Sequence, residues 1–206
     1  MFKQIISGRR LTDILLFGVT AAELVLLLFL TPTFTISDWI YVLQHLLVLG
    51  IALTRPLPVA KDYSLLSTIA VIIAYAYPYA QVAYVRWVPG NPAWPAGGLV
   101  LVAFGTCLSL ASLLSLGRRF AAFPALRSLA TRGPYRLVRH PMYLSYVIAD
   151  IGWNLHEWNF GTAVLVMAGW GSLFYRILAE ERVLSQDAGW STYVALVRYR
   201  IFPGLW

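Results

Sequence analysis

Long apolar stretches separated by short polar ones dominate the pattern along this chain. Six windows carry almost no charge, at residues 11–30, 39–53, 63–85, 97–116, 141–153 and 160–178. A helix needs about 20 mostly apolar residues to cross the hydrocarbon core of a bilayer. The pattern therefore predicts an all-α fold, a polytopic transmembrane bundle of about five to six membrane helices. The short window at 141–153 is expected to form a C-terminal helical hairpin with the last one.

Two polar stretches divide the windows. Residues 88–98 are rich in proline and glycine, which predicts a loop on the outer side of the membrane. Residues 117–140 combine arginines with apolar side chains at helical spacing, which predicts an amphipathic segment along the interface. Its apolar side chains are Phe120, Phe123, Leu126 and Leu129. We expect Gly133 and Pro134 to end that segment and Pro141 to begin the next helix.

The chain lacks a linker long enough to divide it, so we expect one membrane domain over residues 1–206. Residues 1–116 would form four N-terminal transmembrane helices. Residues 117–206 would form the interfacial segment, the hairpin and a C-terminal tail, and this half concentrates the chemically active side chains. The first apolar window is longer than that of a signal peptide, so we expect it to be retained.

Composition and charge support a membrane location. The chain is 59% hydrophobic and 12% charged, against about 25% charged residues in soluble domains. Every lysine and arginine except Arg86 falls in a segment that alternate crossings place on one side. Basic residues collect on the cytoplasmic side, which predicts a multi-pass protein with both termini cytoplasmic, in the inner membrane if bacterial. The net charge of +7 favours membrane lipids, not nucleic acid, as partners.

Several polar side chains lie inside the apolar windows, where burial in lipid is costly and function is a common reason for them. We expect Glu23 and His45 to form a structural pair between the first two helices. Asp150 is a candidate for orienting a substrate, and Gln44 has no assigned role. Cys107 is the one cysteine of the sequence, so neither a disulfide nor a cysteine-based metal site is predicted.

One motif carries the chemistry. The run GPYRLVRHPMYLS at residues 133–145 is followed by AEERVL at 179–184 and by a tail that closes on Pro203. From residue 118 onward the chain resembles the isoprenylcysteine carboxyl methyltransferase family and its phospholipid methyltransferase relatives. The resemblance implies S-adenosylmethionine as cofactor, enclosed by the Arg-His-Pro segment, the hairpin and the tail. Ser145 departs from the family pattern, since relatives often carry a glycine there, but serine is small enough for close helix contact.

The resemblance implies a set of site residues. Arg139 or Arg136 would hold the cofactor carboxylate, His140 would donate a hydrogen bond, and one glutamate of the pair would accept from the ribose or the ammonium. The other glutamate would form an ion pair, with Arg176 or Arg182 as partner. The predicted cofactor-binding residues are Tyr135, Arg136, Arg139, His140, Pro141, Tyr143, Leu144, Glu180, Glu181 and Tyr193. The predicted catalytic residues are Arg139, His140 and Asp150, with no metal.

The acceptor stays open at this level. The resemblance implies a lipophilic or prenylated substrate that enters from the bilayer and is methylated on its carboxylate. A phospholipid amine and a small thiol are alternatives within the same superfamily. A sterol-type reductase that uses a nicotinamide dinucleotide and a transporter are alternatives of other classes, and the oligomeric state is not predicted.

Overall fold

The computed structural model describes residues 2–30, 36–91 and 93–206. In these residues seven α-helices and one pair of two-residue strands occur, which confirms the all-α prediction. The helices are α1 (Phe2–Leu30), α2 (Ile36–Thr54), α3 (Leu65–Trp87), α4 (Pro95–Leu116), α5 (Pro141–His156), α6 (Phe160–Leu184) and α7 (Trp190–Leu196). The strands are β1 (Ala60–Lys61) and β2 (Ala125–Leu126), and 3₁₀ turns lie at Gly117–Arg119 and Gly133–Arg136.

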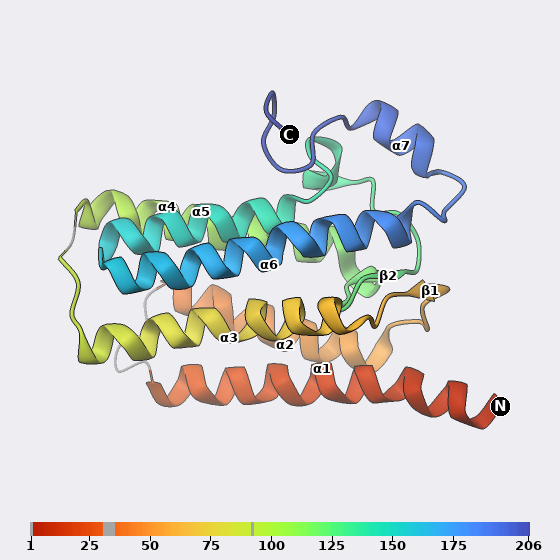
Figure 1. Ribbon diagram of the computed structural model, residues 1–206, viewed down its shortest axis with the longest axis horizontal. Coiled ribbons are helices and arrows are strands. Elements are labelled where there is room, and N and C mark those ends of the chain that lie inside the picture. Colours follow the sequence, from red (N-terminus) through yellow and green to blue (C-terminus); the bar gives the residue numbers. More distant parts are fainter. Residues whose placement is uncertain (1, 31–35, 92) are drawn as a thin grey trace.

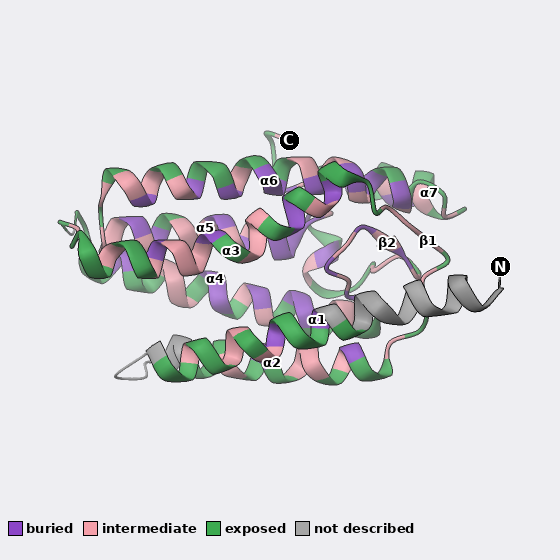
Figure 2. Ribbon diagram, turned by 60° about the horizontal axis from the view of Figure 1, so that its bottom comes forward, coloured by how far each residue is buried: buried purple, intermediate pink, exposed green. Residues whose placement is uncertain are grey.

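The first six helices run alternately up and down one bundle (Figure 1). Three of the described helical stretches are long and apolar enough to cross a membrane, namely Leu65–Trp87, Pro95–Arg119 and Phe160–Leu184. The stretches Leu16–Phe29 and Trp39–Thr54 are apolar but shorter. Figure 2 shows exposed residues on the outward faces of the helices, and many of them are large and apolar, such as Phe29, Ile72 and Phe104. An apolar exterior is the surface that lipid tails require.

One end of the bundle collects the segments rich in arginine. The N-terminus, the connection after α2, residues 117–140 and helix α7 all lie at this end, called the basic end below (Figure 1). Helix α5 is only 16 residues long, or about 24 Å. It begins deeper in the bundle than the point where α6 ends, so the Arg-His-Pro motif is recessed (Figure 1). The assignment of the basic end to the cytoplasm stays a prediction from charge.

Close contact between α4 and α5 positions the motif. A Cβ atom on Gly152 would lie 2.6 Å from the carbonyl oxygen of Gly98, and one on Gly105 would lie 2.7 Å from that of Ser145. Ser145 is fully buried, and its hydroxyl donates to the carbonyl of Met142 at 2.6 Å. Serine therefore permits the close approach that we expected at this position. Small residues at helix contacts are a common means of packing in membranes.

The close contact between α4 and α5 predicts that a methyl group added at this contact lowers the stability of the protein. Gly152→Ala is expected to destabilise the bundle by about 1–3 kcal/mol, because the added methyl group would push two backbones apart. Gly171→Ala on α6 is the matched control, since a Cβ atom at that position would meet no neighbouring atom within 4 Å. Thermal unfolding of both variants in the same detergent measures the difference. Equal unfolding temperatures for the two would contradict this account of the α4–α5 contact.

The expected interfacial helix at 117–140 is wrong. Residues 120–132 are irregular apart from β2, which pairs antiparallel with β1, with Ala60 opposite Leu126. Burial alternates along the segment, with Ala122, Pro124 and Leu126 buried in the protein. Pro124 is the physical reason, because proline has no N–H and disfavours helical geometry in the residue before it. Phe120 is also buried in the protein, so these apolar groups do not lie against lipid.

The polar side chains of the first helices find partners. His45 Nε2 lies 3.5 Å from Glu23 Oε2, which confirms the predicted pair between α1 and α2. Gln44, left without a role by the sequence, donates to the Thr106 carbonyl at 3.0 Å and accepts from the Ser109 hydroxyl at 3.0 Å. It therefore joins α2 to α4. The side chains of Lys3, Arg9 and Arg10, which entered the charge argument, lie outside the described residues.

Candidate functional site

A cavity of about 390 Å³ extends from the basic end into the bundle. The motif, helix α6 and helix α7 line the part nearest the basic end, called the outer part below. The side chains that line the outer part include Tyr135, Arg139, His140, Tyr143, Arg176, Glu180, Trp190 and Tyr193. Arg136, Pro141, Leu144 and Glu181, which the sequence placed at the cofactor, do not line the cavity.

The C-terminal tail holds the motif from outside. The backbone N–H of Arg139 donates to the Tyr199 carbonyl at 2.9 Å, and that of His140 donates to the Arg200 carbonyl at 2.8 Å. Pro141 follows as the first residue of α5, where its missing N–H leaves no helical hydrogen bond unmade. The first turn of α5 is thus fixed by residues nearly 60 positions further along the chain, which no local pattern indicates.

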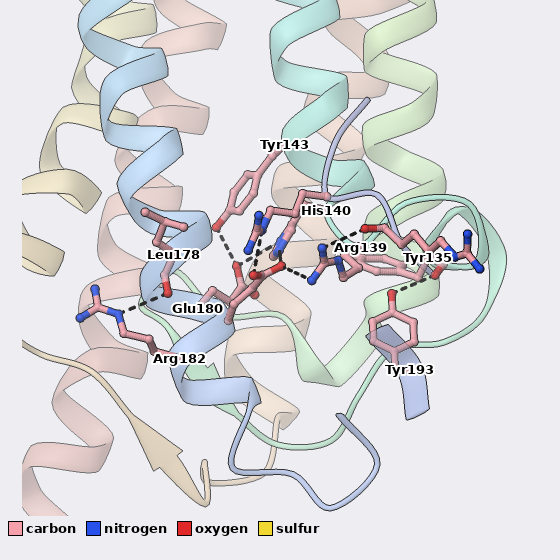
Figure 3. Close-up of polar contacts among 11 residues, drawn as sticks. Tyr135, Arg139, His140, Tyr143, Leu178, Glu180, Arg182 and Tyr193 are labelled. Carbon is pink, nitrogen blue, oxygen red and sulfur yellow. Dashed lines mark hydrogen bonds and ion pairs between the residues drawn. The ribbon is translucent and has the colours of Figure 1, made fainter. Parts of the chain in front are cut away.

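Glu181 is the centre of a buried ion-pair network. Two of its partners, Arg139 and His140, are labelled in Figure 3. Its carboxylate lies 2.9 Å from Arg139 Nη1, 2.9 Å from Arg200 Nε and 3.4 Å from His140 Nε2. Arg139 Nη2 also donates to the Arg198 carbonyl at 3.0 Å. Desolvation lowers the pKa of the Arg139 guanidinium from its ordinary value, while Glu181 opposes that shift. The network therefore joins the motif, α6 and the tail.

One glutamate of the pair forms an ion pair, as predicted, but the predicted partners are wrong. Glu181 pairs with Arg139 and Arg200, and neither Arg176 nor Arg182 reaches it. Arg182 donates from Nε to the carbonyl of Leu178 in its own helix (Figure 3). Adjacent residues on a helix point about 100° apart, so Arg182 faces outward while Glu181 faces the motif.

Glu180 is the glutamate that lines the cavity. The Tyr143 hydroxyl donates to Glu180 Oε2 at 3.0 Å, and His140 Nδ1 lies 3.9 Å from the same oxygen (Figure 3). The rings of His140 and Tyr143 are stacked with centroids 5.6 Å apart. The Glu180 side chain is 30% exposed, so a carboxylate oriented by two neighbours remains accessible to a ligand.

Aromatic side chains form another wall of the outer part. The Tyr193 hydroxyl of α7 donates to the Tyr135 carbonyl at 2.9 Å, which ties α7 to the motif. Desolvation raises the pKa of Tyr193 to about 12, so its hydroxyl stays protonated at neutral pH. Trp190 lies beside Tyr193 with ring centroids 6.1 Å apart. Flat aromatic surfaces of this kind can stack on an adenine or face a cation.

The remaining predicted residues lie elsewhere. Arg136 is exposed on the 3₁₀ turn, Pro141 is buried in the helix start, and Leu144 packs against the cluster of Tyr143 and Ile201. Asp150 lines the cavity deeper in the bundle. It accepts hydrogen bonds from the Tyr77 hydroxyl at 3.0 Å and from Trp170 Nε1 at 2.8 Å.

Arg176 lines the cavity, whereas the sequence indicated it only as an ion-pair partner of a glutamate. It is 7% exposed and donates from Nη2 to the Ala122 carbonyl at 3.0 Å. Its guanidinium carbon lies 5.3 Å from the centroid of the Tyr143 ring, and its Nε is buried without a partner. Within the described residues it has no ion pair. The available signal was its position four residues before Glu180, which places both on one helix face.

The described part of the chain has no group of three or more histidine, cysteine, aspartate or glutamate residues arranged to hold a metal ion.

Comparison with known proteins covers this same region. Residues 94–187 match the phospholipid methyltransferase family. The protein-S-isoprenylcysteine O-methyltransferase A of Arabidopsis thaliana is 31% identical over 98 residues, which are 45% of this chain and half of that protein. The B protein of the same plant is 26% identical over 140 residues, which are 64% of this chain and 68% of that protein.

The predicted family resemblance is confirmed. The region matched to the family contains α4, the motif, Arg176 and both glutamates, and leaves out α1 to α3 and most of the tail. Together with the apolar helices, these matches indicate a membrane protein. The alignment spans half the length of one curated relative and about two thirds of the other.

Proposed function

We propose that this chain is a membrane methyltransferase that transfers a methyl group from S-adenosylmethionine to a lipophilic acceptor. The observation that carries the proposal is the cluster of His140, Tyr143 and Glu180 at the outer part of the cavity. It lies within the region that matches a methyltransferase family. A sterol-type reductase is not favoured, because the matched relatives are named as methyltransferases.

The residues present fit such a cofactor. Glu180 offers an accessible carboxylate for hydroxyl or ammonium donors, and Tyr135, Trp190 and Tyr193 offer aromatic faces. Arg139 Nε is a buried donor with no partner in the described structure. Its two terminal nitrogens already bind Glu181 and the Arg198 carbonyl. Arg139 would therefore orient the site and would not bind a ligand through both terminal nitrogens. When bound, S-adenosylmethionine supplies a transferable methyl group on a sulfonium.

Arg176 favours an anionic acceptor. A buried cation without an ion-pair partner is costly, and a ligand carboxylate in the cavity would compensate it. A phospholipid amine in its protonated form would instead be repelled. We therefore propose carboxyl methylation, with a prenylated cysteine as the first acceptor to test because the named relatives act on isoprenylcysteine. A small thiolate is the second candidate, since it is also an anion.

The chain would act mainly by positioning. A carboxylate acceptor is already a nucleophile, so no residue of the chain would be required as a general base. Arg176 would hold the carboxylate, the buried walls would exclude water, and both effects lower the barrier. Asp150, further along the cavity, is proposed to orient the acceptor. The cofactor would enter from the cytoplasm at the basic end, and the acceptor from the bilayer.

Cofactor binding tests the proposal. Glu180→Gln is expected to weaken binding of S-adenosylmethionine at least about tenfold, because it removes a charge that accepts hydrogen bonds. Glu157→Gln is the matched control, since Glu157 lies in the loop between α5 and α6, at the opposite end of the bundle. Titration calorimetry of the detergent-solubilised protein measures both. A folded wild-type protein that binds neither S-adenosylmethionine nor its demethylated product would overturn the proposal.

A further inference from the structure

The cavity continues past the site just described. Beyond the hydrogen bond between Tyr77 of α3 and Asp150 of α5, its lining includes Gln81 and Trp153. We call this region the deep end. Arg176 lies six residues beyond Trp170, the other donor to Asp150, in the direction of the basic end. That spacing corresponds to about 9 Å of helix, so the deep end lies farther from the basic end than Arg176, the residue proposed to hold the acceptor carboxylate.

Two hydrogen-bond donors at the deep end have no partner. Gln81 is 3% exposed, and its Nε2 is buried and unpaired within the described residues. Trp153 Nε1 is likewise buried and unpaired there. The indole N–H can only donate, so the group that would satisfy it must be an acceptor. Leaving such donors unpaired in an apolar interior is costly, and buried polar groups in proteins are almost always paired.

The two donors lie at the same level of the bundle. Gln81 is four residues after Tyr77 and therefore lies on the same face of α3. Trp153 is three residues after Asp150 and lies on the same face of α5. Tyr77 and Asp150 are themselves joined by a hydrogen bond of 3.0 Å. Helices α3 and α5 run in the same direction (Figure 1). One turn beyond that bond, both donors therefore face the space between the two helices.

The surroundings restrict what can bind. Apolar side chains such as Leu27, Pro78 and Val82 complete this part of the lining, and the carboxylates of Glu23 and Asp150 also line the cavity. The Asp150 carboxylate disfavours an anion, Glu23 is already paired with His45 at 3.5 Å, and the two N–H donors disfavour a cation. An uncharged oxygen on an apolar body satisfies both conditions. Such a molecule would be concentrated in the surrounding bilayer.

We propose that the deep end is a binding site for an uncharged lipophilic carbonyl compound, whose oxygen accepts hydrogen bonds from Gln81 and Trp153. A ketone or a quinone has the required chemistry. The site does not depend on the methyl-transfer reaction, because none of its donors belongs to the outer part. A buried water molecule is the competing occupant, and it would give no preference for a carbonyl ligand.

A matched pair of ligands tests the proposal. Farnesylacetone carries one ketone on an isoprenoid chain, and its hydrocarbon counterpart has a methylene group in place of the carbonyl. Each is added to the full-length protein in detergent, and the rise of the thermal unfolding temperature is followed against its mole fraction in the micelles. We expect the ketone to reach half of its maximal effect at a mole fraction about tenfold lower than the hydrocarbon.

Variants then locate the effect. Trp153→Phe and Gln81→Leu should each reduce the tenfold preference for the ketone to about threefold or less. Trp158→Phe makes the same chemical change at an exposed position between α5 and α6 and should keep the full preference. Equal responses of the wild-type protein to ketone and hydrocarbon would overturn the proposal. Binding of S-adenosylmethionine to the same preparations is scored separately, so a failure of the proposed enzymatic function is recognised as a distinct result.

Discussion

Arg176→Met is expected to reduce kcat/KM for a prenylated cysteine acceptor by about a hundredfold or more, because it removes the charge that would hold the carboxylate. Methionine keeps much of the apolar bulk of the arginine stem. Affinity for S-adenosylmethionine should change less than about threefold, since Glu180 and the aromatic wall remain. Transfer of a labelled methyl group to an S-farnesylcysteine derivative measures the first quantity, and calorimetry measures the second.

Two further variants interpret that loss. Arg182→Met makes the same change on the outer side of α6, where the guanidinium donates to the carbonyl of Leu178, and it should retain wild-type activity. Arg176→Lys keeps the charge but not the planar geometry and should recover part of the rate. If Arg176→Met methylates the acceptor at the wild-type rate, the carboxylate-binding role assigned to Arg176 is wrong.

Glu181→Ala is expected to destabilise the protein by about 3–5 kcal/mol, because Arg139 and Arg200 would lose the carboxylate that compensates their burial. The tail should then be held less firmly against the motif, because Arg200 would keep only its backbone hydrogen bonds and its contact with the Trp206 ring. Ile201 and Trp206 would still pack against α5 and α6. Thermal unfolding measures the loss of stability, and limited proteolysis after residue 196 measures the loosening of the tail. Binding of S-adenosylmethionine should weaken together with the hold on the tail.

A double variant distinguishes the network from a general effect of the substitution. Adding Arg200→Ala to Glu181→Ala removes one of the two stranded cations and should restore part of the stability. Glu157→Ala, at a partly exposed glutamate whose carboxylate lies 3.9 Å from His156 Nε2, should unfold near the wild-type temperature. Unfolding of Glu181→Ala at that same temperature, with the tail still protected, would contradict the proposed role of the network.

The helices were predictable because lipid imposes a simple requirement on sequence. Six apolar windows correspond to α1 through α6, and Pro141 begins α5 as expected. The last apolar window ends at residue 178, and α6 continues through the AEERVL run to Leu184, where the family resemblance placed the end of that helix. Its final turns carry charges that an apolar window excludes. Those charges are accommodated because Glu181 is paired inside the protein, a contact that hydropathy cannot indicate.

The site was predictable only in its local part. The motif placed Arg139, His140 and Tyr143 together. The glutamate pair was also predicted to belong to the site, and the structure identifies Glu180 as the one that lines the cavity beside His140 and Tyr143. Arg176 was counted with the basic residues that set topology, because its pairing state is invisible in sequence. The extended segment around Pro124 was misjudged because helical spacing of apolar residues was given more weight than a single proline. The hydrogen bonds that the backbone N–H groups of Arg139 and His140 donate to the Tyr199 and Arg200 carbonyls depend on long-range folding and have no sequence signal.

The position of the tail also affects how the protein is made. The helices that form the bundle precede residue 185, whereas the contacts that fix Arg139 and His140 come from residues 198–200. During synthesis the membrane-embedded part can therefore be complete before the site exists. The six helices could therefore be inserted while the outer cavity still lacks one of its walls. Competence to bind would be acquired only after residues 198–200 have been added and have docked on the motif.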